Sequence, residues 1–327
     1  MIDYILGDKR HNLPQGLSMA TAHTNIALVK YWGKRDETLN LPVTSSLSVT
    51  LPGLGTQTKI TAIKENFDAI ELNNVVLDFE HEMYRRIISF LDLIRPTPEI
   101  HYAIQTENNI PTAAGLASSA SGFAALVKAL NGLHRWELTA TQQSLLARLG
   151  SGSACRSLWN GFVECHAGKR DDGMDSFAEP LDKPWPQLCV GLVILQTTFK
   201  RTSSREAMIR TVHSSPLYKN WPKQVERDLA SVKTAIYHRD FELLGNTAEA
   251  NSEAMHATMK TALPPVNYDI DATIDTKEKV RQLRQDGVEV YFTQDAGPNV
   301  KLLFLADDED EVKEIFPGIN VIVPFAS

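Results

Sequence analysis

The order of strand-like and helix-like patterns along the chain constrains its fold more than any other feature of the sequence. Apolar and polar side chains alternate over 45–51, and strand-like segments follow at 58–63 and 69–79, the last turning at Asn73-Asn74. Alternation with a period of two residues is typical of a strand with one buried face. These segments predict an antiparallel sheet in the first half of the chain.

Helical patterns surround and follow one further strand-like segment. Apolar residues recur at helical spacing over 80–95, a strand is expected over 101–107, and the strongly apolar run 116–133 predicts a buried helix. Thr139 and Gln142 have the spacing of a capping box, which predicts that a helix begins there.

The second half begins at about residue 185 and mixes both kinds of element. The apolar run 188–195 has the length of a strand buried on both faces, and 203–260 is helical with an interruption near Ser214-Ser215-Pro216. Strands and helices in this order predict an α+β fold rather than a regular βαβ repeat. The remaining expected elements are a helix over 276–287, strands over 288–294 and 300–306, a helix over 308–316 and a strand over 319–325.

Composition excludes several classes of protein. The 327 residues carry 33 basic and 40 acidic side chains, a net charge of −7, which argues against a protein that binds a phosphate backbone. No run approaches the roughly 18 to 20 apolar residues that span a bilayer, and charged residues interrupt the apolar stretch at the N-terminus, so no signal peptide is expected. We therefore expect a cytoplasmic protein without nucleic-acid or membrane partners, long enough for two packed domains.

The usual metal-binding patterns are absent from the sequence. The three cysteines include no C-x-x-C pair, so neither a disulfide framework nor a zinc site is indicated. The acidic run 307–310 looks like a metal site, but we interpret it as the first turn of the last helix, where negative charge is favourable.

Two segments could bind anions. In 111–123, Gly115, Ser118 and Ser119 lead into the apolar helix, so exposed N–H groups at a helix start could hold phosphate, although a tightly packed helix explains the segment equally well. In 22–36, Lys30, Lys34 and Arg35 cluster with Tyr31 and Trp32 before a glycine turn, which suits phosphate oxygens; alone, a solvated basic turn is the simpler interpretation.

Two further segments could take part in chemistry. In 148–157, Ser151, Gly152 and Ser153 could surround a second anion and Arg156 could clamp a carboxylate or phosphate, whereas Cys155 is more simply a buried thiol than a nucleophile. In 291–300, Asp295 follows a strand and precedes Gly-Pro, a position that usually belongs to a turn.

Taken together and in this order, the four segments resemble a known enzyme superfamily. PTAAGLASSASGF is similar to the phosphate-binding motif of the galactokinase, homoserine kinase, mevalonate kinase and phosphomevalonate kinase superfamily. NIALVKYWGKRD, GSGSACRS, FKRTSSREAM and YFTQDAGPNV resemble the mevalonate diphosphate decarboxylase family within it. The resemblance extends from about residue 19 to the C-terminus.

The resemblance implies a two-domain fold. An N-terminal domain of left-handed βαβ type is expected over 19–185, and a ferredoxin-like domain over 186–327, with the active site between them. Residues 1–18 are expected to be an extension to the family pattern, to which we assign no role.

The reaction implied by the resemblance is ATP-dependent decarboxylation of (R)-5-diphosphomevalonate to isopentenyl diphosphate, with ADP, phosphate and carbon dioxide released. ATP is required because a tertiary hydroxyl is a poor leaving group until it is phosphorylated. The implied cofactors are ATP and magnesium, the latter held mainly by phosphates, with no protein ligand nominated. A homodimer is also implied.

Residue roles follow from the matched motifs. Asp295 is expected to accept the proton of the tertiary hydroxyl, and Lys30 to keep Asp295 ionised. Arg156 is expected to hold the substrate carboxylate, and Gly115, Ser118 and Ser119 the ATP phosphates. The expected substrate-facing residues are Tyr31, Trp32, Gly33, Lys34, Ser151, Gly152, Ser153, Ala154, Cys155, Arg156, Ser204 and Arg205.

Two positions depart from the family pattern. Thr202 stands where valine usually precedes the two serines, and Ala207 where glycine usually precedes Met208. Neither change removes a charged group, so only the geometry of the loop over the ATP tail is placed in doubt.

Other functions remain open from the sequence. The nearest are a mevalonate 3-kinase, a phosphomevalonate decarboxylase, and a non-catalytic nucleotide-binding relative. Retention of both Lys30 and Asp295 disfavours the kinase and the non-catalytic relative, and retention of Tyr31, Lys34 and Arg205 favours a diphosphate substrate.

Overall fold

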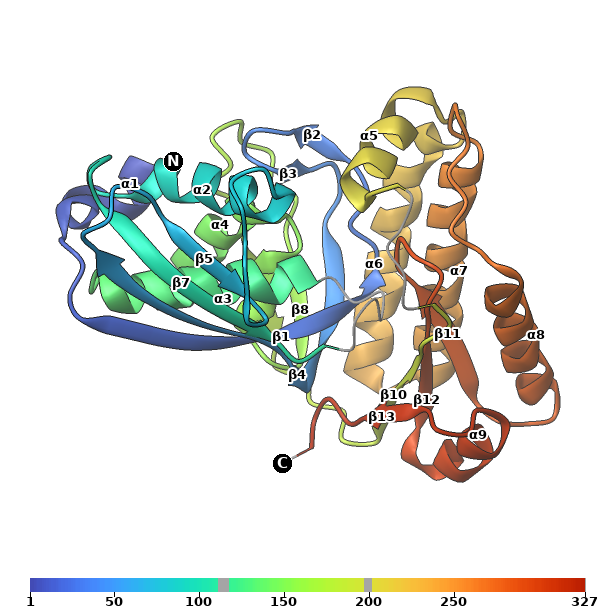
Figure 1. Ribbon diagram of the computed structural model, residues 1–327. Coiled ribbons are helices and arrows are strands. Elements are labelled where there is room, and N and C mark those ends of the chain that lie inside the picture. The colour runs from blue at the N-terminus through green and yellow to red at the C-terminus, as the bar shows by residue number, and fades with distance from the viewer. Residues whose placement is uncertain (111–117, 197–201, 327) are drawn as a thin grey trace.

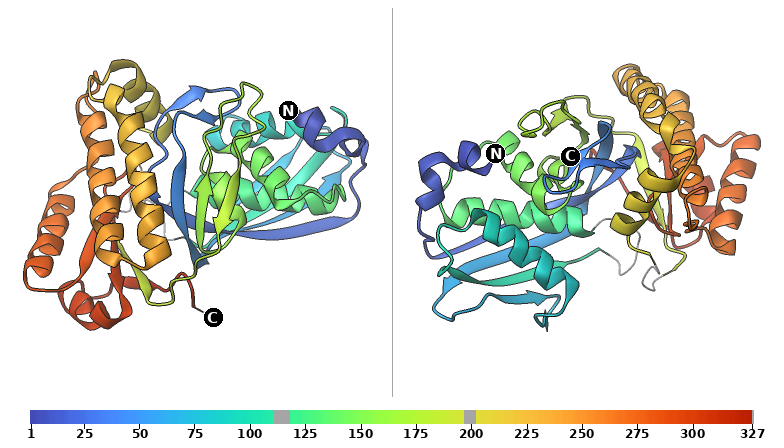
Figure 2. Two further views of the ribbon diagram at one scale, coloured as in Figure 1. Left: turned by 180° about the vertical axis from the view of Figure 1, so that it is seen from behind. Right: turned by 90° about the horizontal axis from the view of Figure 1, so that it is seen from above.

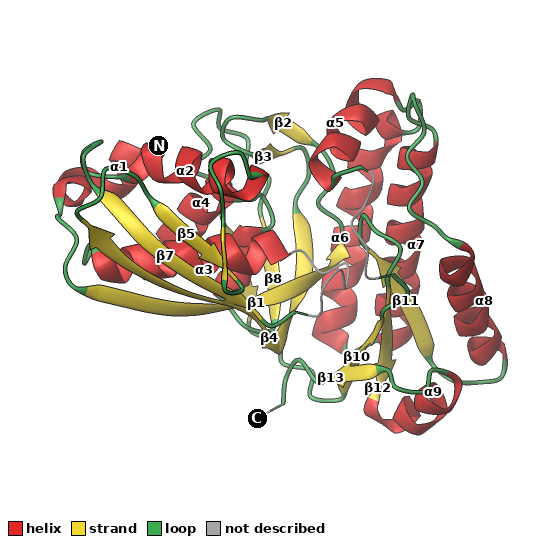
Figure 3. Ribbon diagram, in the orientation of Figure 1, coloured by secondary structure: helices red, strands yellow, loops and turns green. Residues whose placement is uncertain are grey.

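The computed structural model describes residues 1–110, 118–196 and 202–326 (Figure 1). These residues form two main β-sheets, one in each half of the chain, with helices beside each (Figure 3). The α+β, two-domain prediction is confirmed. The expected domain boundaries stay a prediction.

The first sheet has seven strands in the order β6-β5-β7-β4-β8-β9, with β1 beside β4. Its longest strands are the antiparallel pair β1, Leu17–Val29, and β4, Ser46–Ile63. The segments 45–51 and 58–63 are therefore one strand and not two. Gly53, with φ 80°, lets the backbone turn within β4.

The expectation of a purely antiparallel sheet is wrong at one position. Strand β5, Ala69–Leu72, runs parallel to β7, His101–Asn108. Parallel neighbours need a crossover, and α2, Glu82–Ile94, lies in the connection between them. The predicted turn is confirmed, because Asn73 and Asn74 both have positive φ before β6, Val75–Val76.

Helices α3 and α4 belong to the same half as this sheet. Helix α3, Ser118–Leu133, contacts β1, β4 and β7, and its apolar residues are buried as predicted. Helix α4, Ala140–Gly150, contacts α2 and α3 and begins at the predicted capping box of Thr139 and Gln142. Elements that the sequence analysis missed include β2, Lys34–Asp36; β3, Leu41–Pro42; β8, Phe162–Cys165; and β9, Ala178–Leu181.

The first 16 residues lie on the first half of the molecule, away from the second half (Figure 2). They form α1, Ile2–Leu6, followed by a 3-10 turn, Gly7–His11, and Ile5 and Leu6 are buried in the core that α2 and α3 share. The Asn12 amide donates to the His134 carbonyl at 3.0 Å. This segment is part of the folded core of the first half.

The second sheet has the order β11-β12-β10-β13, and all neighbours are antiparallel. This order and its connections match a ferredoxin-like sheet. Alternate residues of β10 face two different hydrophobic clusters, so the strand is buried on both faces as predicted. The strands are β10, Leu188–Val193; β11, Val290–Gln294; β12, Val300–Leu305; and β13, Asn320–Ile322.

The helical region over 203–260 divides into three helices, with breaks at 215–220 and 239–240. Helix α7 contacts both β1 and β11, so it connects the two halves through one hydrophobic core (Figure 1). Of the acidic run, Asp307 and Asp308 lie in a 3-10 turn, and Glu309 and Asp310 lie in the first turn of α9, so the prediction is confirmed for the second pair. The helices of this half are α5, Ser204–Ser214; α6, Trp221–His238; α7, Phe241–Lys260; α8, Asp271–Gln285; and α9, Glu309–Ile315.

The helices within the described ranges include none that is both long and apolar enough to cross a membrane.

Candidate active site between the two sheets

Lys30 and Asp295, predicted as a pair, lie in contact. Lys30 follows β1 and Asp295 follows β11, and Lys30 Nζ donates to Asp295 Oδ1 at 2.8 Å. The same ammonium donates to the Ala27 carbonyl at 2.8 Å, and the Lys30 amide donates to Asn251 Oδ1 at 2.8 Å. Because Lys30 is only 2% exposed, burial lowers its pKa, and the Asp295 carboxylate opposes that shift.

A second lysine, which the sequence analysis missed, reaches the other oxygen of this carboxylate. Lys301 on β12 places Nζ 3.5 Å from Asp295 Oδ2, and its side chain is 1% exposed. Burial also lowers the pKa of Lys301, and Asp295 again opposes the shift. The sequence could have indicated Lys301 only as a charged residue within an apolar strand, VKLLFL.

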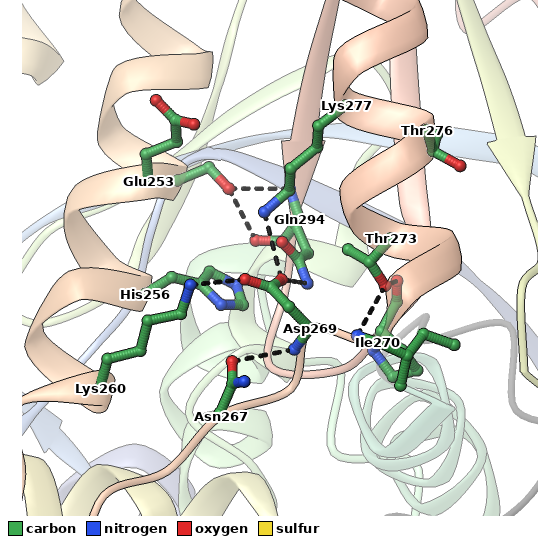
Figure 4. A network of polar contacts seen from close by, with 12 residues as sticks. Glu253, His256, Lys260, Asn267, Asp269, Ile270, Thr273, Thr276, Lys277 and Gln294 are labelled. Carbon is green, nitrogen blue, oxygen red and sulfur yellow. Dashed lines mark hydrogen bonds and ion pairs between the residues drawn. The ribbon is translucent and has the colours of Figure 1, made fainter.

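A polar network around Asp269 includes Gln294, the residue before Asp295 (Figure 4). His256 Nε2 donates to the Asp295 carbonyl oxygen at 3.2 Å. Gln294 donates from its amide to the Gly297 carbonyl at 2.8 Å and to Asp269 Oδ1 at 3.0 Å. Asp269 is held in turn by Lys260 and Lys277 at 2.6 and 3.2 Å.

Three serines from two of the predicted segments lie side by side. Ser151 Oγ is 3.3 Å from Ser153 Oγ and 3.3 Å from Ser119 Oγ, which lies in the first turn of α3. Ser118 begins the same helix and is exposed, whereas Gly115 lies outside the described residues. The expected phosphate-binding helix start and the expected substrate-binding serines therefore meet at one place.

Two buried polar atoms beside these serines lack hydrogen-bond partners among the described residues. They are Arg156 Nε and the Tyr31 hydroxyl. Arg156 is 3% exposed, and its Nη1 donates to Ser46 Oγ at 2.6 Å. Buried polar groups are normally paired, and these two atoms are exceptions within the described residues, as Arg95 Nε also is.

A cluster of positive charge lies across the site. Lys34 Nζ donates to Asn40 Oδ1 at 2.6 Å, and Asn40 is held by the Arg148 and Leu149 carbonyls. Burial, with the nearby Arg205 charge, lowers the pKa of Lys34 to about 8. Burial and Arg205 likewise lower the pKa of Arg86 on α2. Arg86 was missed by the sequence analysis, because it looks like any exposed residue of an amphipathic helix.

Several predicted residues pack around the site. Trp32 is 2% exposed, and its carbonyl accepts hydrogen bonds from Tyr218 and Trp221. Gly33 has φ 110°. Ala154 is also buried. Cys155 is fully buried, and its thiol donates to the Gly152 carbonyl at 3.2 Å.

The second half contributes the start of α5. Ser203 caps this helix, which places Ser204 and Arg205 in its first turn. Thr202, one of the two departures from the family pattern, accepts a hydrogen bond from the Tyr268 hydroxyl through its carbonyl at 3.0 Å. Ala207, the other departure, is fully buried.

The structure brings no metal-binding cluster together within the described ranges: no three His, Cys, Asp or Glu side chains are grouped there as metal ligands are.

Two family models match the chain over most of its length. The diphosphomevalonate decarboxylase-like N-terminal domain matches residues 22–178, and the mevalonate 5-diphosphate decarboxylase C-terminal domain matches residues 190–322. The diphosphomevalonate decarboxylase mvd1 of Aspergillus fumigatus is 37% identical over 315 residues, covering 89% of this chain and 78% of the relative. The Saccharomyces cerevisiae diphosphomevalonate decarboxylase is 37% identical over 312 residues, with the same two coverages.

Solved structures agree in fold. Mevalonate diphosphate decarboxylase from Staphylococcus aureus superposes with a TM-score of 0.88 at 36% identity, covering 95% of this chain and 96% of that one. A structure of MDDEF in complex with MVAPP, AMPPCP and magnesium has a TM-score of 0.87 at 38% identity, covering 94% and 99%. Both the sequence and the fold of this chain therefore place it in the diphosphomevalonate decarboxylase family.

Proposed function

We propose that this chain catalyses the ATP-dependent decarboxylation of (R)-5-diphosphomevalonate to isopentenyl diphosphate, with release of ADP, phosphate and carbon dioxide. The observation that carries the proposal is the placement of the Lys30–Asp295 pair, at 2.8 Å, in a site that also holds the buried Arg156, whose Nε has no partner in the part of the chain that the structure describes. The reaction needs a base for a hydroxyl, a partner for a carboxylate and cations for a diphosphate, and this site offers all three.

Asp295 serves as the base. Its side chain is 26% exposed, so a substrate hydroxyl can approach a carboxylate whose Oδ1 is held by Lys30. Its loop is fixed from behind by His256 and Gln294. Transfer of the hydroxyl proton to a fixed carboxylate lowers the barrier, because the base needs no rearrangement as the hydroxyl oxygen becomes a nucleophile.

Arg156 binds the substrate carboxylate. Its guanidinium already donates to Ser46, so the side chain is oriented before substrate arrives, and Nε remains to donate to an anion. A planar guanidinium suits a carboxylate, and binding in a buried place strengthens the bond. Tyr31, whose hydroxyl is also unpaired, packs on Gly152 and faces the same ligand.

Lys34, Arg86 and Arg205 bind the diphosphate. Arg205 lowers the pKa of both Lys34 and Arg86, which means that like charges are held close together. Such repulsion is relieved when a polyanion binds between the cations. A diphosphate is a better match for three cations than an uncharged or monoanionic group.

ATP and magnesium are the cofactors of the reaction. MDDEF has been solved in complex with AMPPCP and magnesium, and the start of α3 offers this chain the hydroxyls and N–H groups of Ser118 and Ser119 for phosphate oxygens. Bound ATP with magnesium supplies the phosphoryl group that turns the tertiary hydroxyl into a leaving group. Asp295 is a poor candidate for a magnesium ligand, because an ammonium group faces each of its oxygens.

We also propose the domain division, location and assembly that the sequence analysis expected. The connection from β9, which ends at Leu181, to β10, which begins at Leu188, supports a boundary near 185. The three free, buried cysteines suit the reducing cytoplasm. A homodimer rests on the family resemblance alone.

One assay tests the function. Mevalonate, its 5-phosphate and its 5-diphosphate are each offered with ATP and magnesium, and ADP and carbon dioxide are measured separately. Equal amounts of both products from the diphosphate alone would support the proposal. ADP without carbon dioxide would indicate a kinase. Both products from the monophosphate would indicate a phosphomevalonate decarboxylase. If no substrate yields either product, the chain is a binding protein.

A further inference from the structure

Lys301 occupies a position where a lysine is costly. It lies in the middle of the second sheet, where it pairs with Leu192 on β10 and Thr293 on β11. Its neighbours Val300 and Leu302 belong to the hydrophobic cluster on the opposite face of the sheet. A buried ammonium group persists only when a partner compensates for its lost hydration, and its carboxylate partner here is Asp295.

Each of the two lysines contacts a different oxygen of the Asp295 carboxylate. Lys30 holds Oδ1 at 2.8 Å, and Lys301 faces Oδ2 at the longer distance of 3.5 Å. Of these two contacts the one to Lys301 is the longer, and the Asp295 side chain remains 26% exposed. A hydroxyl can donate to Oδ2 while Lys301 still acts on it through charge.

We propose that Lys301 is a positioning residue that keeps Asp295 ionised and directs Oδ2 toward the substrate hydroxyl, and that it maintains net positive charge beside the transferred phosphoryl group. This inference rests on the proposed function. Two ammonium groups against one carboxylate leave a charge of +1, which rises to +2 when Asp295 accepts the proton. The hydroxyl oxygen forms its bond to phosphorus as the bond from phosphorus to the ADP oxygen breaks with its electron pair.

Within the described ranges, several other charged or titratable groups near Asp295 act elsewhere or are neutral. His256 on α7 bonds the Asp295 carbonyl, and burial lowers the pKa of His256 to about 3, so it is neutral. Lys260 and Lys277 are paired with Asp269. The charge of Arg156 lowers the pKa of Lys30 by repulsion. Its guanidinium donates to Ser46 and, in the proposed function, to the substrate carboxylate.

The test compares the pH dependence of kcat/KM in the wild type, Lys301→Met and Lys301→Arg. An opposite charge within about 4–6 Å favours ionisation of a carboxylate by 1–3 pH units. We expect Lys301→Met to move the acid limb of the profile upward by about one pH unit and to reduce kcat by about tenfold or more, with little change in the KM for ATP. Lys301→Arg should return the limb toward the wild-type position.

The matched control is Lys233→Met, which removes a lysine from an ion pair with Glu164, at 2.6 Å, outside the site. It should leave the acid limb unmoved. If Lys301→Met lowers kcat without moving the limb, and Lys301→Arg is no better, the role is only structural and the inference is wrong. If Lys301→Met does not fold, Lys301→Gln replaces it with the same expected shift.

The wild-type enzyme separates this inference from the proposed function. If the wild type yields no ADP and no carbon dioxide from the diphosphate, the proposed function fails. If the wild type is active but the acid limb of its pH profile is unmoved in Lys301→Met, only the role proposed for Lys301 is wrong.

Discussion

Lys30 Nζ donates to Asp295 Oδ1 at 2.8 Å, although 265 positions separate the two residues along the chain. Lys30 follows a strand of the first sheet, and Asp295 follows a strand of the second. Neither half of the chain contains the pair by itself. The contact depends on α7, which lies against both strands and fixes their relative position.

Replacing Asp295 with Asn should abolish most turnover while leaving ATP binding nearly unchanged. The amide cannot accept the hydroxyl proton, and that interaction matters in the transition state rather than in the ground state. We expect kcat to fall by about 10³-fold, measured as carbon dioxide release at saturating substrates. Asp310→Asn, at an exposed position in the first turn of α9, is the control. Turnover within about tenfold of wild type would contradict the role of Asp295.

The affinity for substrate should weaken as the pH rises through 8. The pKa of Lys34 is lowered to about 8, so its ammonium form, which binds the diphosphate, is lost above that pH in the free enzyme. The KM for substrate should therefore rise between pH 8 and 9.5. In Lys34→Arg the guanidinium stays charged, so the rise should disappear. If the KM of Lys34→Arg rises with pH in the same way as that of the wild type, a group other than Lys34 titrates.

Arg156→Lys should weaken substrate binding although it preserves the charge. Lysine cannot reproduce the planar donor set that joins Ser46 on one side and leaves Nε for the ligand on the other. We expect kcat/KM for the substrate to fall by about 10- to 100-fold, which corresponds to the loss of a charge-assisted hydrogen bond. Ser46→Ala, which removes only the internal partner, should have the smaller effect. Equal losses in both variants would mean that Arg156 acts mainly through Ser46.

Gly152→Ala should displace Tyr31 and raise the KM for substrate. A Cβ at this position would lie 2.6 Å from Tyr31 Cζ, closer than carbon atoms approach, so the ring must shift. Gly122→Ala in α3 is the control, because nothing lies within 4 Å of its Cβ. That control should stabilise the protein by about 0.5–1 kcal/mol and leave the KM unchanged. If the KM of Gly152→Ala is unaltered, Tyr31 does not contribute to substrate binding.

His256 should make stability depend on pH below neutrality. Its folded pKa of about 3 lies below the ordinary value of 6.5, so between these values the unfolded chain binds more protons and unfolding is favoured as the pH falls. The stability it contributes is fully present above pH 6.5 and is lost below it, by up to about 1.4 kcal/mol per pH unit. Urea unfolding from pH 7 to 5 should show a shallower slope for His256→Gln. Equal slopes would mean that His256 is protonated in the folded protein.

Local features could be predicted because their causes lie within a few residues. The capping box of Thr139 and Gln142 and the turn at Asn73-Asn74 depend on neighbouring backbone groups, and both were confirmed. The motifs also predicted the family, which the comparisons confirmed. The continuity of β4 was missed, because only pairing along β1 carries the strand through Gly53.

What the sequence determined by itself was the α+β class and the family, because these depend on periodicity and on local motifs; the residues it nominates for anion binding stay a prediction. What only the tertiary structure decided was which residues meet. Arg86 lies on a helix face, where nothing in its neighbouring sequence distinguishes it, and Lys301 lies in a buried strand, where only its charge within an apolar run sets it apart. The roles proposed for them rest on contacts between residues far apart in the chain, and α7 lies against strands of both sheets in one hydrophobic cluster.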